Sequence, residues 1–411
     1  MIRHRQRGQR RRLWLAVSAA ALLVTGAVVL VSGVPSRAPA TAPGRPIGVS
    51  TTVVSPVASM PESPLALSPG PSADLSLAEP WLASTPGTVI GHLGAGSDPS
   101  VLPSDLLIVD KFNNRLVVID PQGRIRWQFP QPGDLAAGQT FLIPDDAFFA
   151  PDGKSIIVTQ EDQAVVTIVD IATHRIAYRY GIPGKPGMAN NQLNNPDDAM
   201  MLPNGYILSA DIQNCRLVLI SPGTHQPARI IGLTTTACRH APPQRWGSPN
   251  GAFPMLNGHY LVTEINGDWV DELDLNGTVS WSAHPPGVAY PSDSNEISPG
   301  LYLTVDYSNP GQVVTFDRTG RKVWSFSGTG RDTLNHPSLA LPLPNGDIVL
   351  NDDYNHRVIV IDPRTNKIVW QYGVTGKSGT APGYLNNPDG IDLAPPQSLL
   401  TDHAATMGIW P

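Results

Sequence analysis

Short apolar runs separated by polar turns recur along this chain in a fixed phrase. Each copy has a proline, one or two small polar residues and then an apolar run, and in five of the six copies a glycine stands nine residues after the proline. Self-similarity at a period of roughly 45–50 residues is typical of a stacked or radial repeat. The repeated prolines are Pro144, Pro196, Pro249, Pro291, Pro337 and Pro388.

The hydrophobic pattern predicts four short strands in each copy. The first apolar run ends at a turn such as Pro203-Asn204-Gly205, and Asn-Gly between two apolar runs indicates a hairpin because both residues tolerate positive φ. A second strand follows, then a third such as Val358–Asp362, then a fourth with aromatic residues such as Ile368–Tyr372. Four short antiparallel strands per repeat form one blade of a β-propeller.

The third strands indicate six blades, because such runs begin near residues 115, 165, 216, 269, 312 and 357. The first blade has no opening strand of its own, whereas the opening phrase stands alone near the C-terminus, at Asn387–Leu393. We therefore predict an all-β, six-bladed β-propeller over residues 81–400, followed by a tail at 401–411. The C-terminal strand completes the first blade and closes the ring, which removes open sheet edges.

Two motifs carry a family resemblance. The segment Tyr180–Pro196 nearly repeats as Tyr372–Pro388 with the same spacing, and an Asp-x-x-Asn-x-Arg turn begins at Asp110, Asp211 and Asp352. With these motifs, residues 100 to 395 resemble the NHL-repeat family of six-bladed propellers. The tryptophan-bearing fourth strands are also similar to propellers of the quinoprotein and arylsulfotransferase type. Three copies of the Asp-x-x-Asn-x-Arg turn in different blades indicate a scaffold role, through hydrogen bonds within each blade.

The N-terminus predicts a membrane anchor. Residues 1–12 contain six arginines and no acid, and residues 13–34 are 22 residues without a charge. At 1.5 Å per residue, such a helix spans about 30 Å of hydrocarbon. Basic residues before a span stay in the cytoplasm, so we predict a cytoplasmic tail (1–12), a single transmembrane signal anchor (13–34) and an extracytoplasmic propeller at the cell membrane. A cleaved signal peptide ending at Ala38-Pro39-Ala40 is the alternative.

Residues 35–80 predict a disordered linker, because they contain ten prolines, few charges and no aromatic residue. The net charge is −6 despite the N-terminal arginines, which argues against nucleic acid as a partner.

Outside the membrane, the two cysteines, Cys215 and Cys238, can form a disulfide that ties the insertion at 234–246 to its blade. Two separate buried thiols are the alternative.

The polar residues after the repeated prolines form the candidate site. The first strand of a blade lies innermost, so these residues are expected to ring one mouth of the central channel. We expect these side chains chiefly to cap turns by bonding to their own backbone. The alternative is a Ca²⁺ cofactor, because converging oxygen atoms are what Ca²⁺ requires. The ring candidates are Asp145, Asp146, Asp197, Asp198, Asn250, Asp293 and Asp389.

Catalytic signals in the sequence are weak. Neither an HExxH motif nor a Gly-x-Ser-x-Gly elbow occurs. His336 precedes a repeated proline, and Glu296 lies on a predicted inner strand, so these two are the candidates for acid–base chemistry. We therefore favour a binding or scaffold module for a protein, peptide or glycan ligand over an enzyme. The alternative is a metal-dependent hydrolase or lyase with Ca²⁺ at the channel mouth.

Overall fold

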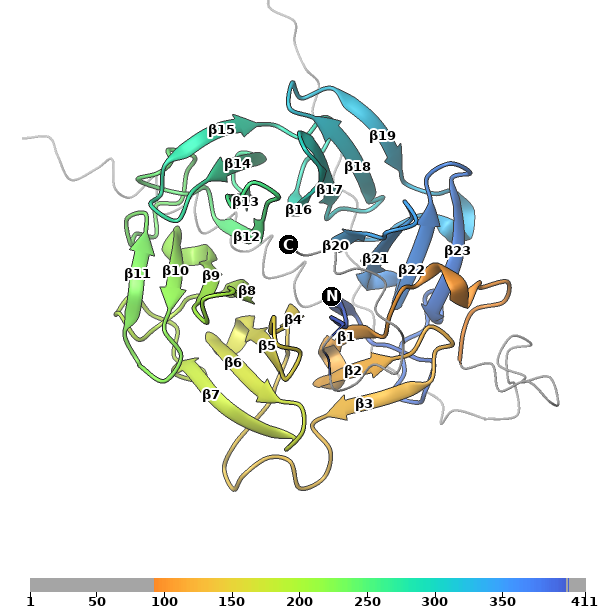
Figure 1. Ribbon diagram of the computed structural model, residues 1–411, viewed down its shortest axis with the longest axis horizontal. Helices are drawn as coiled ribbons and strands as arrows, with labels where there is room; N and C mark the ends of the chain where they lie inside the picture. The colour runs from red at the N-terminus through yellow and green to blue at the C-terminus, as the bar shows by residue number, and fades with distance from the viewer. Residues whose placement is uncertain (1–91, 397, 399–411) are drawn as a thin grey trace, which may run out of the picture. The chain divides into compact units, whose positions relative to one another are not determined.

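Six four-stranded antiparallel sheets surround a common axis in the computed structural model, which describes residues 92–396 and 398 (Figure 1). The fold is an all-β, six-bladed propeller, as the repeats predicted. Within the described residues there are short 3₁₀ turns but no α-helix, and none of these helical turns could span a bilayer. The predicted cytoplasmic tail (1–12), anchor (13–34), linker (35–80) and C-terminal tail (401–411) lie outside the described residues.

Each blade is ordered from an inner strand at the axis to an outer strand at the rim. Blade 1 consists of β24 (Pro388–Leu393), β1 (Leu106–Asp110), β2 (Arg115–Ile119) and β3 (Ile125–Phe129). Blade 2 consists of β4 (Ala147–Phe149), β5 (Ser155–Gln160), β6 (Val165–Asp170) and β7 (Arg175–Gly181). Blade 3 consists of β8 (Pro196–Met201), β9 (Ile207–Asp211), β10 (Arg216–Ile220) and β11 (Pro227–Ile231).

The other three blades follow the same order. Blade 4 consists of β12 (Pro249–Pro254), β13 (Tyr260–Glu264), β14 (Trp269–Leu273) and β15 (Val279–Ala283). Blade 5 consists of β16 (Pro291–Ser298), β17 (Leu301–Asp306), β18 (Gln312–Asp317) and β19 (Lys322–Phe326). Blade 6 consists of β20 (Pro337–Pro342), β21 (Ile348–Asp352), β22 (Arg357–Asp362) and β23 (Lys367–Gly373).

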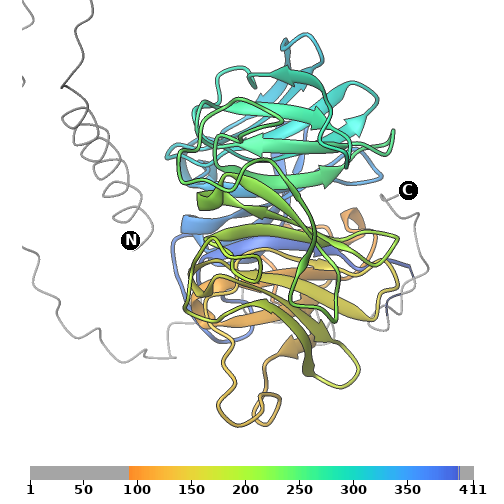
Figure 2. The ribbon, with the colours of Figure 1, turned by 90° about the vertical axis from the view of Figure 1, so that its left-hand side faces the viewer.

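Short 3₁₀ turns join the second and third strands in four blades. These are η3 (Lys111–Asn113), η4 (Glu161–Gln163), η5 (Ile212–Asn214) and η7 (Asp353–Asn355); η2 (Pro99–Val101) and η6 (Gly330–Asp332) lie elsewhere. The second strands end, and the inner strands begin, at the same end of the ring. We call this end the proline face, because the repeated prolines lie there; Figure 2 shows the ring from the side, with the connections gathered at its two faces.

The C-terminal strand closes the ring, as predicted. Strand β24 pairs antiparallel with β1, with Leu106 opposite Leu393 and Ile108 opposite Ile391. All five residues of β1 are fully buried, because β24 covers one edge of β1 and β2 covers the other. Closure therefore joins segments that are almost 300 residues apart in the chain and leaves β1 with no free edge.

The hydrophobic core is divided between the blades. The described residues form six apolar clusters that lie between neighbouring blades, and the cluster between blades 6 and 1 also takes in the inner-strand residues Phe148, Met200 and Phe253. Tryptophans of the fourth strands also link blades, because each indole Nε1 donates to the next blade. The pairs are Trp127 with the Ile171 carbonyl (3.2 Å), Trp281 with the Arg318 carbonyl (3.0 Å), Trp324 with Asn366 Oδ1 (2.8 Å) and Trp370 with the Pro121 carbonyl (2.9 Å).

The Asp-x-x-Asn-x-Arg turns are a scaffold device, as predicted. In blade 3 the buried Asp211 carboxylate accepts from Asn214 Nδ2 at 2.8 Å and from Arg216 Nε at 2.7 Å. Asn214 also donates to the Gly187 carbonyl at 2.8 Å, which holds the loop that leads into β8. The turns of blades 1 and 6 repeat this pattern, so each fixes its blade to the incoming loop on the proline face.

Candidate functional site

A β-bulge repeated in five blades aims two consecutive side chains of the inner strand at the axis. In blade 3, Pro196 pairs with Asp211 and Ala199 pairs with Ser209. Strand β8 therefore advances by three residues where β9 advances by two, which leaves one extra residue on β8. The same shift occurs at the start of the inner strands of blades 1, 4, 5 and 6. A bulge redirects side chains that would otherwise alternate between faces. In these five blades it explains why both residues after the proline are buried near the axis.

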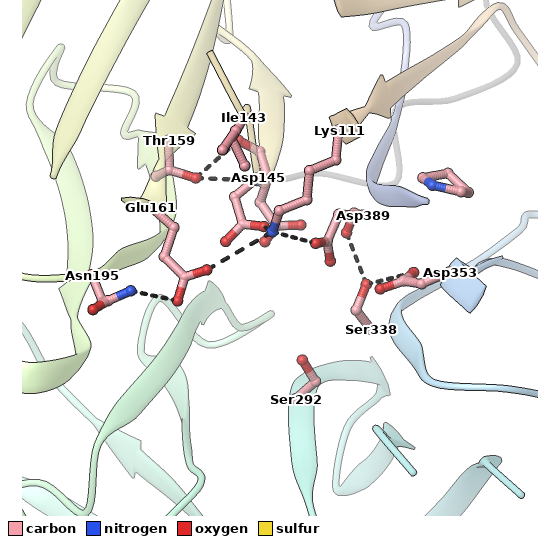
Figure 3. A network of polar contacts seen from close by, with 12 residues as sticks. Lys111, Ile143, Asp145, Thr159, Glu161, Asn195, Ser292, Ser338, Asp353 and Asp389 are labelled. Carbon is pink, nitrogen blue, oxygen red and sulfur yellow. Dashed lines mark hydrogen bonds and ion pairs between the residues drawn. The ribbon is translucent and has the colours of Figure 1, made fainter. Parts of the chain in front are cut away.

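A buried lysine occupies part of the predicted ring. Lys111 Nζ is 2.6 Å from Asp389 Oδ2 and 3.8 Å from Glu161 Oε2, and it also contacts Asp145 (Figure 3). Asn195 Nδ2 donates to Glu161 at 2.8 Å. We call Lys111, Asp145, Glu161 and Asp389 the lysine cluster. Its three carboxylates therefore have a cation from the protein itself.

Three further carboxylates of the ring meet beside the lysine cluster. Ligand oxygens of Asp146, Asp198 and Asp293, from blades 2, 3 and 5, lie within 4.8 Å of one another. We call these residues the axial cluster. Asp145, Asp146 and Asp197 form a second group of the same spacing, so the axial cluster adjoins the lysine cluster through neighbouring residues.

Two carboxylates of the axial cluster, those of Asp198 and Asp293, are deeply buried. Each residue is only 2% exposed, and within the described part of the chain no donor meets either carboxylate in good hydrogen-bond geometry, although the Asn250 side chain lies close to Asp293. Burial, reinforced by the Asp293 carboxyl, raises the pKa of Asp198 well above its usual value, and burial raises the pKa of Asp293 to about 7. Carboxyl groups in this position share protons or bind a cation, because two buried like charges repel.

Glycines leave the space in which these carboxylates meet. A Cβ atom at Gly251 would lie 2.3 Å from Asp198 Oδ2 and 2.3 Å from Asp293 Oδ1. A Cβ atom at Gly390 would lie 2.8 Å from Asp146 Oδ1. These glycines stand at the second position after Pro249 and Pro388, where blades 2, 3 and 5 carry aspartate. Oxygen donors gathered in this way fit Ca²⁺, which takes six to eight oxygen ligands.

The remaining ring positions are held by hydrogen bonds. Asn250 Nδ2 donates to Ser292 Oγ at 3.2 Å, which leaves the Asn250 Oδ1 atom buried and without a donor. Ser338 Oγ donates to the Asp389 carbonyl at 2.8 Å and contacts Asp353 Oδ1 at 3.2 Å (Figure 3). Asn250, Ser292 and Ser338 of blades 4, 5 and 6 therefore add neutral, hydrogen-bonded side chains to the ring.

The two catalytic candidates are separated by the structure. Glu296 accepts backbone hydrogen bonds from Leu256 and Gly300, both at 3.0 Å, toward the end of β16 away from the proline face. His336 lies on the proline face, where its ring packs against Tyr307 (4.9 Å between centroids) and Tyr354 (4.5 Å). The structure thus does not bring Glu296 and His336 to a common site.

The two cysteines are joined in a disulfide, with their Cα atoms 5.0 Å apart. Cys215 closes the η5 turn of blade 3, and Cys238 belongs to the insertion between β11 and β12. The disulfide therefore fastens this insertion to the proline face.

Lys111 and Glu161 were missed by the sequence reasoning. A lysine and a glutamate that directly follow a strand are usually solvated, so neither residue suggested a buried ion pair. A difference between the repeats could have indicated Lys111. A lysine follows Asp110 in the Asp-x-x-Asn-x-Arg turn of blade 1, whereas isoleucine follows Asp211 and aspartate follows Asp352.

One family model matches part of the chain. A family model described as PQQ_2, outer membrane protein assembly factor BamB, matches residues 243–387, about a third of the chain. No curated protein matches the chain.

Solved structures resemble the chain at low sequence identity. One is a protein of unknown function from Bacteroides caccae, 18% identical, with a TM-score of 0.48, covering 70% of this chain and 98% of that one. Another belongs to a nidogen/laminin complex, 14% identical, with a TM-score of 0.49 and coverages of 71% and 98%. Virginiamycin B lyase from Staphylococcus aureus is 13% identical, with a TM-score of 0.40 and coverages of 55% and 69%.

Proposed function

We propose that this chain is a membrane-tethered, extracytoplasmic propeller that acts as a binding module for a protein, peptide or glycan, and that a Ca²⁺ ion at the axial cluster stabilises its proline face. The observation that carries the proposal is the convergence of Asp146, Asp198 and Asp293 with no donor in good hydrogen-bond geometry on the oxygens of the last two. A bound divalent cation would join blades 2, 3 and 5 at the axis and offset the repulsion between the three carboxylates.

The ligand would bind to loops on the proline face. The insertion at 232–248 and the loop at 130–143 are irregular, and both lead into inner strands on that face. A rigid ring with variable loops suits recognition, because little conformational entropy is lost when the ligand binds. The NHL assignment is part of this proposal, and the three repeated Asp-x-x-Asn-x-Arg ion pairs support it.

A metal-dependent hydrolase or lyase has less support from the described residues. Glu296 is engaged with backbone amides away from the axis, and the His336 ring packs between two tyrosines on the proline face. We therefore assign the axial cation a stabilising role rather than a catalytic one.

Calcium titration of the full-length protein tests the proposal. We expect calorimetry to detect one Ca²⁺ per chain and the melting temperature to rise with Ca²⁺ concentration. Asp198→Asn and Asp293→Asn should each weaken Ca²⁺ binding by about tenfold or more, because Ca²⁺ affinity depends on the number of charged ligands. Without Ca²⁺, both variants should be at least as stable as the wild type, because each removes one of the repelling charges.

Asp152→Asn is the matched control, because Asp152 is an exposed acid in a turn of blade 2. It should leave Ca²⁺ binding unchanged. Failure of the wild type to bind Ca²⁺ at millimolar concentration, or equal binding by the Asp198 and Asp293 variants, would contradict the cation site.

Panels of glycans and peptides, probed with and without EDTA, test the binding role. Turnover of an ester or lactone that EDTA abolishes would favour the enzyme instead.

A further inference from the structure

Blade 4 departs from the ion-pair turn at the end of its second strand. In blades 1, 3 and 6, the acid at this position pairs with an arginine five residues later, at 2.6, 2.7 and 2.8 Å. In blade 4 the acid is Glu264, and Trp269 takes the place of the arginine. Glu264 is nevertheless fully buried. The hairpin of blade 4 therefore supplies no arginine to pair with the buried carboxylate, unlike the hairpins of blades 1, 3 and 6.

A second carboxylate and a histidine meet Glu264. Asp271, from β14, is also fully buried, and its carboxyl group lies within hydrogen-bonding reach of the Glu264 carboxyl group. His240 reaches in from the insertion, with Nδ1 3.0 Å from Glu264 Oε1 and 3.7 Å from Asp271 Oδ2. The donor atoms of all three residues lie within 4.8 Å of one another. One imidazole nitrogen and two carboxylates thus face a single point.

The two carboxylates are fixed by neighbouring groups. The Gly247 amide donates to Glu264 Oε2, and Ser282 Oγ donates to Asp271 Oδ1. Gly247 is required for this approach, because a Cβ atom there would lie 2.4 Å from Glu264 Oε2 and 2.2 Å from the Asn266 carbonyl. Each carboxylate therefore has one oxygen held in place and one directed toward His240.

The histidine is also held in position. Its ring stacks on Trp269, with 4.0 Å between centroids and an interplanar angle of 12°. The insertion that carries His240 is fastened by the Cys215–Cys238 disulfide on one side, and by the fully buried Trp246 on the other. The site is thus preorganised on the proline face, in a segment that the propeller repeat does not need.

We propose that His240, Glu264 and Asp271 form a Zn²⁺ site at the edge of the proline face. Zinc binds histidine nitrogen and carboxylate oxygen at about 2.0–2.2 Å, so tetrahedral ligands stand about 3.4 Å apart. The separations of 3.0 and 3.7 Å from His240 Nδ1 lie on either side of that distance. Two carboxylates balance the charge of one Zn²⁺, and an imidazole ligand favours Zn²⁺ over Ca²⁺ or Mg²⁺.

Three protein ligands leave the fourth zinc position open, which distinguishes this site from closed structural sites with four protein ligands. The His240 side chain is 23% exposed, so solvent reaches the site from that side. The open position would take a water molecule or a donor atom from a ligand bound on the proline face. This inference uses residues separate from the axial cluster and is independent of Ca²⁺ binding there.

Zinc binding to the full-length protein tests the site. We expect the protein, stripped with a chelator and returned to Zn²⁺, to retain one zinc per chain by mass spectrometry of the metal. His240→Gln and Asp271→Asn should weaken binding in competition with a chromophoric chelator. Removal of an outer-shell partner lowers metal affinity by about 10–100-fold. The loss of zinc affinity should be larger here, because each variant removes a direct ligand. Co²⁺ in place of Zn²⁺ should give the visible absorption of tetrahedral coordination, and His240→Gln should abolish it.

His259→Gln is the matched control. His259 also contacts a glutamate of blade 4, with Nδ1 2.7 Å from Glu272 Oε1, but Arg318 already supplies a cation to Glu272 at 2.6 Å. Zinc binding should therefore survive His259→Gln, and also Asp198→Asn at the axis. His240→Gln keeps the site testable if Asp271→Asn fails to fold, because His240 is partly exposed. No bound zinc in the wild type, or unchanged zinc affinity in His240→Gln, would overturn the site.

Discussion

The Lys111 side chain supplies a positive charge where three carboxylates of the propeller axis meet. It is 1% exposed and contacts Asp145, Glu161 and Asp389. A buried charge left without its partner is strongly destabilising, even where the complete pair contributes little net stability. This residue is therefore a structural counter-ion of the ring.

We expect Lys111→Met to lower the free energy of unfolding by about 3–5 kcal/mol, because it leaves the Asp145 and Asp389 carboxylates buried without a cation. Urea denaturation measures the loss. Lys154→Met, at an exposed turn of blade 2, is the control and should change stability by less than about 0.5 kcal/mol. A change of under 1 kcal/mol for Lys111→Met would show that the ring does not depend on this charge.

Asp392 predicts a pH dependence of stability. Burial raises the pKa of Asp392 to about 7, although its carboxylate accepts hydrogen bonds from the amides of Phe149 and Leu393. The folded state therefore binds a proton that the unfolded state, with an ordinary aspartate pKa near 3.8, releases earlier. This contribution to stability is complete below about pH 4 and is lost as the pH rises toward and past 7.

Urea titrations from pH 4 to pH 8, with EDTA present to exclude metal ions, measure the effect. We expect the wild type to lose stability over this range, and Asp392→Asn to lose less, because an amide does not titrate. An equal slope for both proteins would show that Asp392 is ionised in the fold.

At the residue scale, the sequence indicated a ring of polar residues, but not its separation into the lysine cluster and the axial cluster. The repeated prolines drew attention to Asp145, Asp198 and Asp293, which are buried at the start of the inner strands. Whether each carboxylate has a cation depends on contacts such as Lys111 with Asp389, which are 278 residues apart. The cluster of His240, Glu264 and Asp271 has no motif spacing, because one ligand lies on an insertion and two lie on neighbouring strands.

At the scale of the elements, the hairpin signals and the period were sufficient to count the blades. Asn-Gly turns and apolar runs are local features, so they predicted the strands and the closing role of β24. The bulges at the start of the inner strands were not predicted, because they arise from pairing with the second strands. In five blades, these bulges bring both residues after the proline to the axis, and thus determine the geometry of the site.

Strand β24 should be indispensable for folding. Removal of residues 388–411 exposes the edge of β1, whose five residues are otherwise fully buried, and open edges of apolar strands aggregate. We expect the shortened protein to elute as aggregates in gel filtration and to lose its near-ultraviolet circular dichroism. Truncation after residue 398, which keeps β24, is the control and should remain monodisperse. A monomeric, folded protein without β24 would contradict the closing role.

At the scale of the whole molecule, the chain combines a closed ring with a long N-terminal segment of different composition. The ring is the part that the structure describes, and its core is divided into six clusters between blades. The uncharged run at 13–34 is the basis of the proposed tether, and the proline-rich segment at 35–80 separates it from the ring in the sequence.

Membrane extraction tests the tether. We expect the full chain to remain in the membrane pellet after alkaline carbonate washing, because a spanning helix resists extraction. A variant without residues 1–34 should be found in the soluble fraction. Protease added outside intact cells should degrade the ring of the full chain if the propeller faces outward. Release of the full chain by carbonate would contradict a retained anchor and favour the cleaved signal peptide.

The pairing of β24 with β1 has a consequence for the order of folding. The first blade contains strands from both ends of the ring, so β1 to β3 are synthesised early but cannot complete their sheet until residues 388–393 emerge. Contacts between such distant segments form slowly, because a long loop must close first. The blade that is translated first is therefore the last to be completed, and assistance by chaperones would matter most during this interval.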